Sequence, residues 1–268
     1  MLKEVIEIAL RAGEETLKIY KRDFRVEYKE DKTPLTEADK ISHEIIEEGL
    51  RKLSPEIPIL SEEGSHIHYD ERKNWRKLWL VDPLDGTKGF IKKLGDFTVN
   101  IALVENRNTV LGVVYAPAKG VIYFAEKGKG AKRADVKNGT VVNEVSIPQR
   151  GTRKVRVVVS RSHLDENTKA FLNNLKKKFD DLETINAGSS LKFCLLAEGK
   201  ASVYPRFSPT MEWDTVAGHA ILREAGGMVL IAPSMNEELY YNKETLKNPS
   251  FVAVSGQREV IDILKELA

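Results

Sequence analysis

The chain has 268 residues, a hydrophobic fraction of 41% and a charged fraction of 31%. This balance is too apolar for a disordered chain, and no apolar run reaches the roughly 18 residues that a membrane-spanning helix needs. Lys and Arg number 42 against 40 Asp and Glu, so the net charge of +2 gives no electrostatic reason to expect a nucleic-acid partner. The single cysteine, Cys194, excludes an internal disulfide. We therefore expect a globular, cytoplasmic protein without a membrane partner.

The first 60 residues predict two helices, a loop and a short strand. Residues 3–21 repeat apolar side chains at helical spacing. Residues 22–35 are rich in charge and favour an exposed, mobile loop. Thr36 is a suitable N-cap for the next helix, whose apolar stripe ends before Pro55. Residues 57–60 then indicate a short buried strand.

The rest of the chain divides into two patterns. Apolar runs separated by Asn, Gly and Pro predict an antiparallel meander up to residue 126. From residue 154, strands alternate with helices, which is typical of α/β structure. We expect one domain over residues 1–268, with an N-terminal α+β half of about 1–150 and a C-terminal α/β half of about 151–268. The expected fold class is layered α/β, with two sheets and the functional site between the halves.

Two aspartates follow the buried strand at 78–81. Residues 80–87 read Leu-Val-Asp-Pro-Leu-Asp-Gly-Thr, so Asp82 and Asp85 are three residues apart and a turn can point both carboxylates at one spot. Two carboxylates so close repel each other unless a cation lies between them, and hard oxygen ligands suit Mg²⁺. An ordinary surface turn is the alternative, because Asp, Pro and Gly are also common turn residues.

Further acidic residues stand at the ends of predicted elements. Glu62 and Glu63 follow the short strand, and Asp39 and Asp214 lie at the starts of predicted helices. For Asp39 and Asp214 the alternative is helix capping, because a carboxylate stabilises the first turn of a helix. The number of acids at element ends nevertheless favours a metal site.

The string DPLDGT, with the glutamate pair before it and WDTVAGHAILREAGG after it, resembles the inositol monophosphatase superfamily, whose signatures are D-P-[LI]-D-G-T and W-D-x-x-[AG]-G. Within that superfamily the chain is most similar to the CysQ-type 3′(2′),5′-bisphosphate nucleotidases. The matching stretches run from about residue 29 to 227 and depart from the pattern at Gly89, where those relatives carry Glu. The resemblance implies an αβαβα sandwich with the metal site between the halves.

The resemblance also implies a role for each matching residue. Two or three Mg²⁺ ions are expected on the side chains of Glu62, Asp82, Asp85 and Asp214 and the carbonyl of Leu84. Asp39, Glu62 and Thr87 are the expected catalytic residues, with Thr87 orienting the attacking water. The expected substrate-binding residues are Asp85, Gly86, Thr87, Ser160, His163, Gly188, Ser189, Lys192, Arg206 and Asp214.

The expected function is a Mg²⁺-dependent phosphatase that uses an activated water to hydrolyse the 3′-phosphate of adenosine 3′,5′-bisphosphate to AMP. The resemblance adds the sulfated analogue of sulfur assimilation as a second substrate, and sensitivity to lithium. A basic and hydroxylic lining favours a second phosphate over an inositol ring. The alternatives are an inositol monophosphatase or fructose-1,6-bisphosphatase of mixed specificity, and a non-catalytic metal-binding regulator. The expected partner is a small-molecule phosphate ester, with a homodimer left open.

Overall fold

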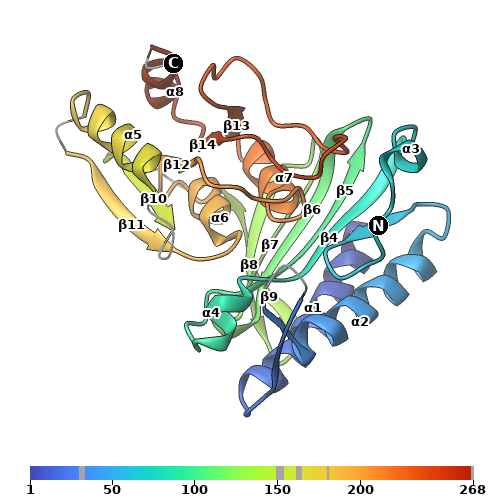
Figure 1. The fold of residues 1–268 in the computed structure, drawn as a ribbon. Coiled ribbons are helices and arrows are strands. Elements are labelled where there is room, and N and C mark those ends of the chain that lie inside the picture. Colours follow the sequence, from blue (N-terminus) through green and yellow to red (C-terminus); the bar gives the residue numbers. More distant parts are fainter. Residues whose placement is uncertain (30–33, 149–153, 161–164, 180, 267–268) are drawn as a thin grey trace.

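Helices and sheets alternate in layers across the protein (Figure 1). The computed structural model describes residues 1–29, 34–148, 154–160, 165–179 and 181–266. Among these residues, no helix is both long enough and apolar enough to cross a membrane. The layered α/β architecture with two sheets is the one that the sequence predicts. That the two halves form a single domain, and that two copies pair, remain predictions.

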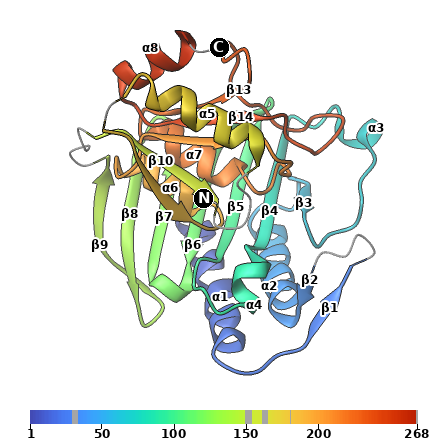
Figure 2. The same ribbon diagram turned by 60° about the vertical axis from the view of Figure 1, so that its left-hand side comes forward.

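The larger sheet has seven strands in the order β3-β4-β5-β6-β7-β8-β9, which Figure 2 shows side by side. The pair β3–β4 is parallel, and every later pair is antiparallel, which confirms the expected meander. The last two strands, β8 and β9, are additional to those predicted; in β8 the charged residues hide the apolar positions. The strands are β3 (Ile59–Ser61), β4 (Lys77–Asp85), β5 (Thr98–Glu105), β6 (Asn108–Ala116), β7 (Val121–Glu126), β8 (Ala131–Lys137) and β9 (Thr140–Ile147).

Two long helices, α1 (Leu2–Tyr20) and α2 (Glu37–Leu53), cover one face of this sheet. Thr36 caps α2 as predicted, because its hydroxyl accepts a hydrogen bond from the backbone N–H of Ala38. The segment before it is not the plain loop that the charge pattern predicts. Its strands β1 (Val26–Tyr28) and β2 (Pro34–Thr36) pair in antiparallel fashion, and residues 30–33 between them lie outside the described part.

The smaller sheet has five strands in the order β11-β10-β12-β14-β13. Helices α6 and α7 lie between the two sheets, and α5 and α8 cover the outer face of the smaller one (Figure 1). These elements are β10 (Arg156–Ser160), α5 (Glu166–Lys176), β11 (Glu183–Ala187), α6 (Leu191–Ala197), β12 (Val203–Arg206), α7 (Val216–Glu224), β13 (Met228–Ile231), β14 (Phe251–Val254) and α8 (Arg258–Glu266). The short helices are α3 (Tyr69–Arg72), α4 (Thr87–Ile91) and the 3-10 turn η1 (Pro117–Lys119).

The alternation of side chains along β4 determines which face of the sheet Asp82 points to. Leu78 and Leu80 pack in the middle layer with α6 and α7, whereas Trp79 and Val81 pack in the cluster of α1 and α2. Successive side chains of a strand point to opposite faces. The next residue, Asp82, is therefore in phase with the two leucines and faces the middle layer.

Candidate active site

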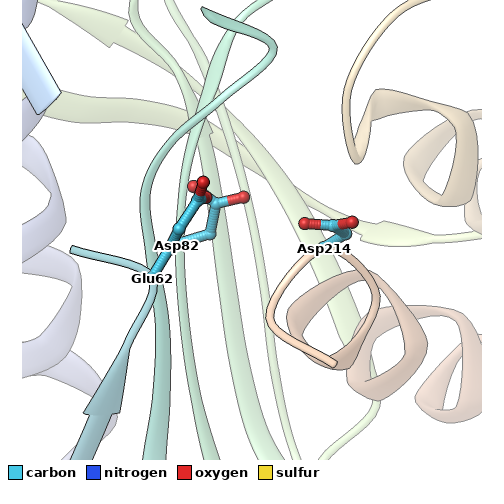
Figure 3. A group of neighbouring side chains, drawn as sticks. All are labelled: Glu62, Asp82 and Asp214. Atoms are coloured by element: carbon cyan, nitrogen blue, oxygen red, sulfur yellow. The ribbon is translucent and has the colours of Figure 1, made fainter. Parts of the chain in front are cut away.

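Three carboxylates converge where the two halves of the molecule meet. Glu62 follows β3, Asp82 belongs to β4, and Asp214 lies just before α7. One carboxylate oxygen of each residue lies within 4.8 Å of those of the other two. Figure 3 shows Glu62 and Asp82 side by side with Asp214 facing them from across the site. We call these three residues the acid trio.

The strand pairing explains why Glu62 reaches this position. Leu60 packs in the middle layer, and Glu62 is in phase with it two residues later. The backbone N–H of Glu62 also donates to the carbonyl of Val81 at 3.1 Å, which extends the β3–β4 pairing by one residue. Adjacent parallel strands thus bring the first two carboxylates together.

Burial makes the acid trio hard to ionise. It raises the pKa of Asp82 well above its usual range, and the nearby carboxylate of Glu62 raises it further. Burial likewise raises the pKa of Asp214 to about 8 and that of Glu62 to about 7. A bound cation would remove this penalty because opposite charge favours the ionised form of each acid.

A lysine from the β1–β2 segment supplies a cation beside the trio. The ammonium nitrogen of Lys29 lies 2.6 Å from Oε1 of Glu63 and 3.2 Å from Oε1 of Glu62. It lowers the pKa of Glu62, against the effect of burial. Lys29 begins the stretch that resembles the nucleotidases, but it stands in a charged run, and its local pattern gives no signal for this contact.

Asp85 adjoins the trio and is held from both halves of the molecule. Its Oδ2 accepts hydrogen bonds from the hydroxyl of Ser190 at 2.8 Å and from the side-chain amide of Asn100 at 3.4 Å. The sequence predicts that the strand ends in a turn at Asp82, and this is wrong. Strand β4 continues to Asp85, with a shift of register in its pairing with β5. Asn100 was not anticipated, although a buried Asn within an apolar strand is itself a signal.

Thr87 and Asp39 form a second polar unit beside the acids. The Thr87 hydroxyl lies 3.1 Å from Oδ1 of Asp39 and 3.2 Å from the carbonyl oxygen of Leu84. The other oxygen of Asp39 accepts from the backbone N–H of Thr36 at 2.7 Å and from its hydroxyl at 2.6 Å. Burial raises the pKa of Asp39, and its hydrogen bonds to Thr36 oppose that rise. Asp39 is therefore a helix-capping residue and a neighbour of Thr87 at the same time.

A pocket with two cationic side chains opens beside Asp85 and Asp214. The ammonium group of Lys192 donates to the carbonyl of Ser189, and burial lowers its pKa to about 8. The guanidinium of Arg206 donates from Nε to a backbone carbonyl two residues away at 3.1 Å. The pocket is lined by Asp85, Ser189, Lys192, Phe193, Tyr204, Arg206, Thr210, Asp214 and Thr215.

Backbone geometry shapes the edge of this pocket. Gly86 has a φ of 94°, a left-handed value that suits glycine, and it is the N-cap residue that precedes α4. A side chain at Gly188 would meet the Cβ of Asp96 at 2.9 Å, so the chain needs glycine there. Ser189 follows with a φ of 48°, which is uncommon for a residue with a side chain.

Several other residues are not where the sequence predicts them, or lie outside the described part of the chain. Ser160 ends β10 and does not line the pocket. His163 lies outside the described residues. Helix α7 begins at Val216, so Asp214 belongs to the preceding turn and not to the start of the helix as expected. The Ser190 hydroxyl makes no cap for α6, because it bonds Asp85 instead.

Comparison with known proteins agrees with this geometry. The model of the inositol monophosphatase family matches residues 1–264. The chain belongs to the inositol monophosphatase family. It is 45% identical over 253 residues to the 3′(2′),5′-bisphosphate nucleotidase CysQ of Salmonella typhimurium, which covers 94% of this chain and 98% of that protein. The crystal structure of CysQ from Bacteroides thetaiotaomicron superposes with a TM-score of 0.86 at 45% identity, covering 96% of this chain and 97% of that one.

A more distant inositol monophosphatase shares the fold. The enzyme of Thermotoga maritima matches with a TM-score of 0.74 at 26% identity, over 98% of this chain and 95% of that one. The predicted resemblance and the predicted fold class are therefore confirmed. Enzymes of the inositol monophosphatase family are phosphatases that use metal ions, and the acid trio is a set of ligands that can bind one. The prediction of an enzyme is confirmed as well.

Proposed function

We propose that this chain is a Mg²⁺-dependent phosphatase that removes the 3′-phosphate of adenosine 3′,5′-bisphosphate and yields AMP. The observation that carries the proposal is the meeting of the acid trio with the pocket of Lys192 and Arg206 at one place. The names of the relatives at 43–45% identity support this substrate class. The sulfated analogue belongs to the same proposal, because it carries the same 3′-phosphate.

The donor set beside the trio suits Mg²⁺. Every ligand atom that the acid trio offers is a carboxylate oxygen, which is the hard donor that this ion prefers. Asp85 and the carbonyl of Leu84 stand next to them and complete the set for two or three ions. When bound there, Mg²⁺ would polarise the phosphoryl group and neutralise charge on the leaving oxygen.

Thr87 and Asp39 are suited to orienting the attacking water. The Thr87 hydroxyl donates its proton toward Oδ1 of Asp39, which leaves its oxygen lone pairs to accept a hydrogen bond from water. Because burial raises the pKa of Asp39, its carboxylate is a better proton acceptor than an exposed aspartate. Thr36 fixes the other oxygen of Asp39, so the acceptor is held in one orientation.

The cationic pocket is suited to a second, unhydrolysed phosphate. Lys192 and Arg206 place positive charge beyond the acids, and a phosphate there would form charge-assisted hydrogen bonds of about 1.5–3 kcal/mol each. An uncharged inositol ring would leave the same donors poorly matched. We therefore propose that adenosine 3′,5′-bisphosphate is preferred over inositol 1-phosphate by at least about tenfold in kcat/KM, which corresponds to 1.4 kcal/mol.

The test is phosphate release from a panel of substrates with and without Mg²⁺. The panel contains adenosine 3′,5′-bisphosphate, its sulfated analogue, inositol 1-phosphate and fructose 1,6-bisphosphate. We expect Mg²⁺-dependent release with the bisphosphate nucleotide preferred, and inhibition by millimolar Li⁺. Equal or reversed preference would indicate an inositol or fructose phosphatase of mixed specificity. Failure to release phosphate from any of the four would indicate a regulator.

A further inference from the structure

A buried group of charged and amide side chains lies directly behind the turn that presents Asp214. Glu212 has none of its surface exposed, and Arg72 and Lys243 have only 2% and 7%. None of them belongs to the acid trio or lines the cationic pocket. Buried charges need partners, so their contacts reveal what this group holds together.

Glu212 ties the turn to the segment that follows β13. Its Oε1 accepts from the ammonium group of Lys243 at 2.6 Å and from the backbone N–H of the same residue at 2.9 Å. Its Oε2 accepts from the backbone N–H of Asn242 at 2.7 Å. Both oxygens of the carboxylate are thus committed to residues about 30 positions away, which have no regular helix or strand.

Asn248 holds the same turn at both ends. Its side-chain amide donates to the carbonyl of Met211 at 2.7 Å and lies 3.1 Å from the hydroxyl of Thr215, while its own carbonyl oxygen accepts from Lys243 at 3.2 Å. Asp214 sits between these two contacts, and its Oδ2 accepts from the N–H of Met211 at 2.8 Å. We call Glu212, Lys243 and Asn248 the clamp. The position of the Asp214 carboxylate depends on it, because the clamp holds the turn on both sides of Asp214.

Arg72 connects the clamp to the other half of the molecule. It ends α3, in the segment that leads from Glu62 to β4. Its guanidinium donates to Oδ1 of Asn242 at 2.8 Å and to the carbonyls of Lys243 at 2.6 Å and Glu244 at 2.8 Å. Asn242 returns a hydrogen bond to the carbonyl of Arg72 at 2.8 Å. The chain after Glu62 and the chain before Asp214 are thus joined behind the site.

We propose that the buried Glu212–Lys243 ion pair is a positioning device that holds Asp214 at the distance from Glu62 and Asp82 that a shared cation requires. The three carboxylates repel one another, and Asp214 is the one that comes from a turn and not from the larger sheet. The clamp opposes that repulsion from behind without touching the cation. This inference rests on the metal site of the proposed function, and it assigns Glu212 and Lys243 no contact with substrate.

The test compares Glu212→Gln with a matched control. Glu198→Gln neutralises a carboxylate whose side chain is 8% exposed and which bonds the Tyr123 hydroxyl at 2.7 Å and Lys200 at 2.6 Å. Glu198 belongs neither to the acid trio nor to the cationic pocket. Calorimetric titration of Mg²⁺ into each full-length variant measures affinity directly, and steady-state kinetics give KM and kcat. We expect Glu212→Gln to bind Mg²⁺ at least tenfold more weakly with KM little changed at saturating metal, and Glu198→Gln to stay within twofold of wild type.

The outcomes separate the positioning role from a role in folding alone. A folded Glu212→Gln protein that binds Mg²⁺ within twofold of wild type would overturn the inference. If that variant does not fold, Asn248→Ala replaces it, because it removes the bonds to Met211 and Thr215 without leaving a charge unpaired. We expect Asn248→Ala to bind Mg²⁺ at least threefold more weakly than wild type. An unchanged affinity for Mg²⁺ in that variant would also overturn the inference. A wild-type protein that does not bind Mg²⁺ would contradict the proposed function itself.

Discussion

The two halves of the molecule contribute opposite charges to one site. The larger sheet delivers acids, since Glu62 follows β3 while Asp82 and Asp85 belong to β4. The half with the smaller sheet delivers cations, since Lys192 lies in α6 and Arg206 ends β12. Acids suit metal binding, whereas cations suit a phosphate that the reaction leaves intact. The comparison leads us to expect that the metal chemistry depends mainly on one half and the substrate choice mainly on the other.

Lys29, a cation beside the acids, is one exception to this division, and Asp214 is another. It is an acid supplied by the cationic half, and it lines the pocket together with Lys192 while belonging to the acid trio. A change at Asp214 should therefore affect both properties. Changes to the other acids should affect mainly the metal chemistry, and changes to Lys192 or Arg206 should affect mainly the substrate choice.

The largest effect is expected from the acidic half. Asp85→Asn removes a charge next to the trio while keeping an acceptor for Ser190, so the protein should stay folded. We expect turnover of every substrate to fall by about 10³-fold or more, because preorganised charge at a reacting centre has effects of that order. Phosphate release at saturating Mg²⁺ measures it, with Asp135→Asn as control, because Asp135 lies in β8 and belongs neither to the acid trio nor to the cationic pocket. Near-normal turnover would remove Asp85 from the metal site.

Thr87→Ala should have the next largest effect. The Thr87 hydroxyl bonds Asp39, and we propose that it orients the attacking water. Its loss should therefore lower kcat by roughly 10²-fold, the scale of a positioned proton-transfer group, with little change in KM. Thr87→Ser keeps the hydroxyl and should recover most of the rate. Steady-state kinetics on both variants decide, and an effect on KM alone would show that Thr87 only binds substrate.

A variant in the cationic half should change substrate choice without stopping the chemistry. Arg206→Ala should reduce the preference for adenosine 3′,5′-bisphosphate over inositol 1-phosphate by about tenfold, the equivalent of 1.4 kcal/mol, mainly by harming the bisphosphate. Parallel kcat/KM values for the two substrates measure this ratio. Arg156→Ala is the control, because Arg156 lies in the same sheet and pairs with Glu183 at 2.9 Å. An unchanged ratio in Arg206→Ala would exclude Arg206 from the specificity site.

The smallest effect concerns the stability of the metal-free protein as pH changes. The pKa values of about 7 for Glu62 and about 8 for Asp214 lie above those of ordinary carboxyls, so the folded state holds protons that the unfolded state releases. Folding is therefore favoured at low pH by these groups, and that contribution is lost as pH rises through about 8. We expect the melting temperature in chelator to fall by several degrees between pH 5.5 and 8.5.

Two controls sharpen that measurement. Saturating Mg²⁺ should abolish most of the fall, because a cation stabilises the ionised carboxylates. The double variant Glu62→Gln/Asp214→Asn should flatten the pH dependence even without metal. A melting temperature that rises over the same range in wild type but not in the double variant would contradict the raised pKa values.

The sequence predicts the parts of the site that depend on residues only a few positions apart. The helix start at Thr36, the capping role that was the alternative for Asp39, and the strand that carries Asp82 follow from spacing within a few residues. The roles assigned by resemblance, including those of Leu84 and Thr87, remain predictions. The structure shows only that these residues lie beside the acids.

Contacts that depend on the path of the chain were beyond reach from sequence. Lys29 meets Glu63 across 34 positions, and Lys243 meets Glu212 across 31. A charged residue in a run of charges is usually solvated, so nothing local distinguishes these lysines from exposed ones. The same reasoning explains why the sequence does not predict β8, since Lys132 and Arg133 stand together between two buried alanines.

The alternation of β4 makes the site tolerant of substitution but intolerant of a change in strand length. Inserting or deleting one residue between Leu78 and Asp82 would turn every later side chain to the opposite face. Asp82 would then point into the apolar cluster of α1 and α2, and Val81 or its replacement would face Asp214. Libraries that vary the identity of the apolar residues in this strand should therefore retain active members, whereas single-codon insertions within it should yield none.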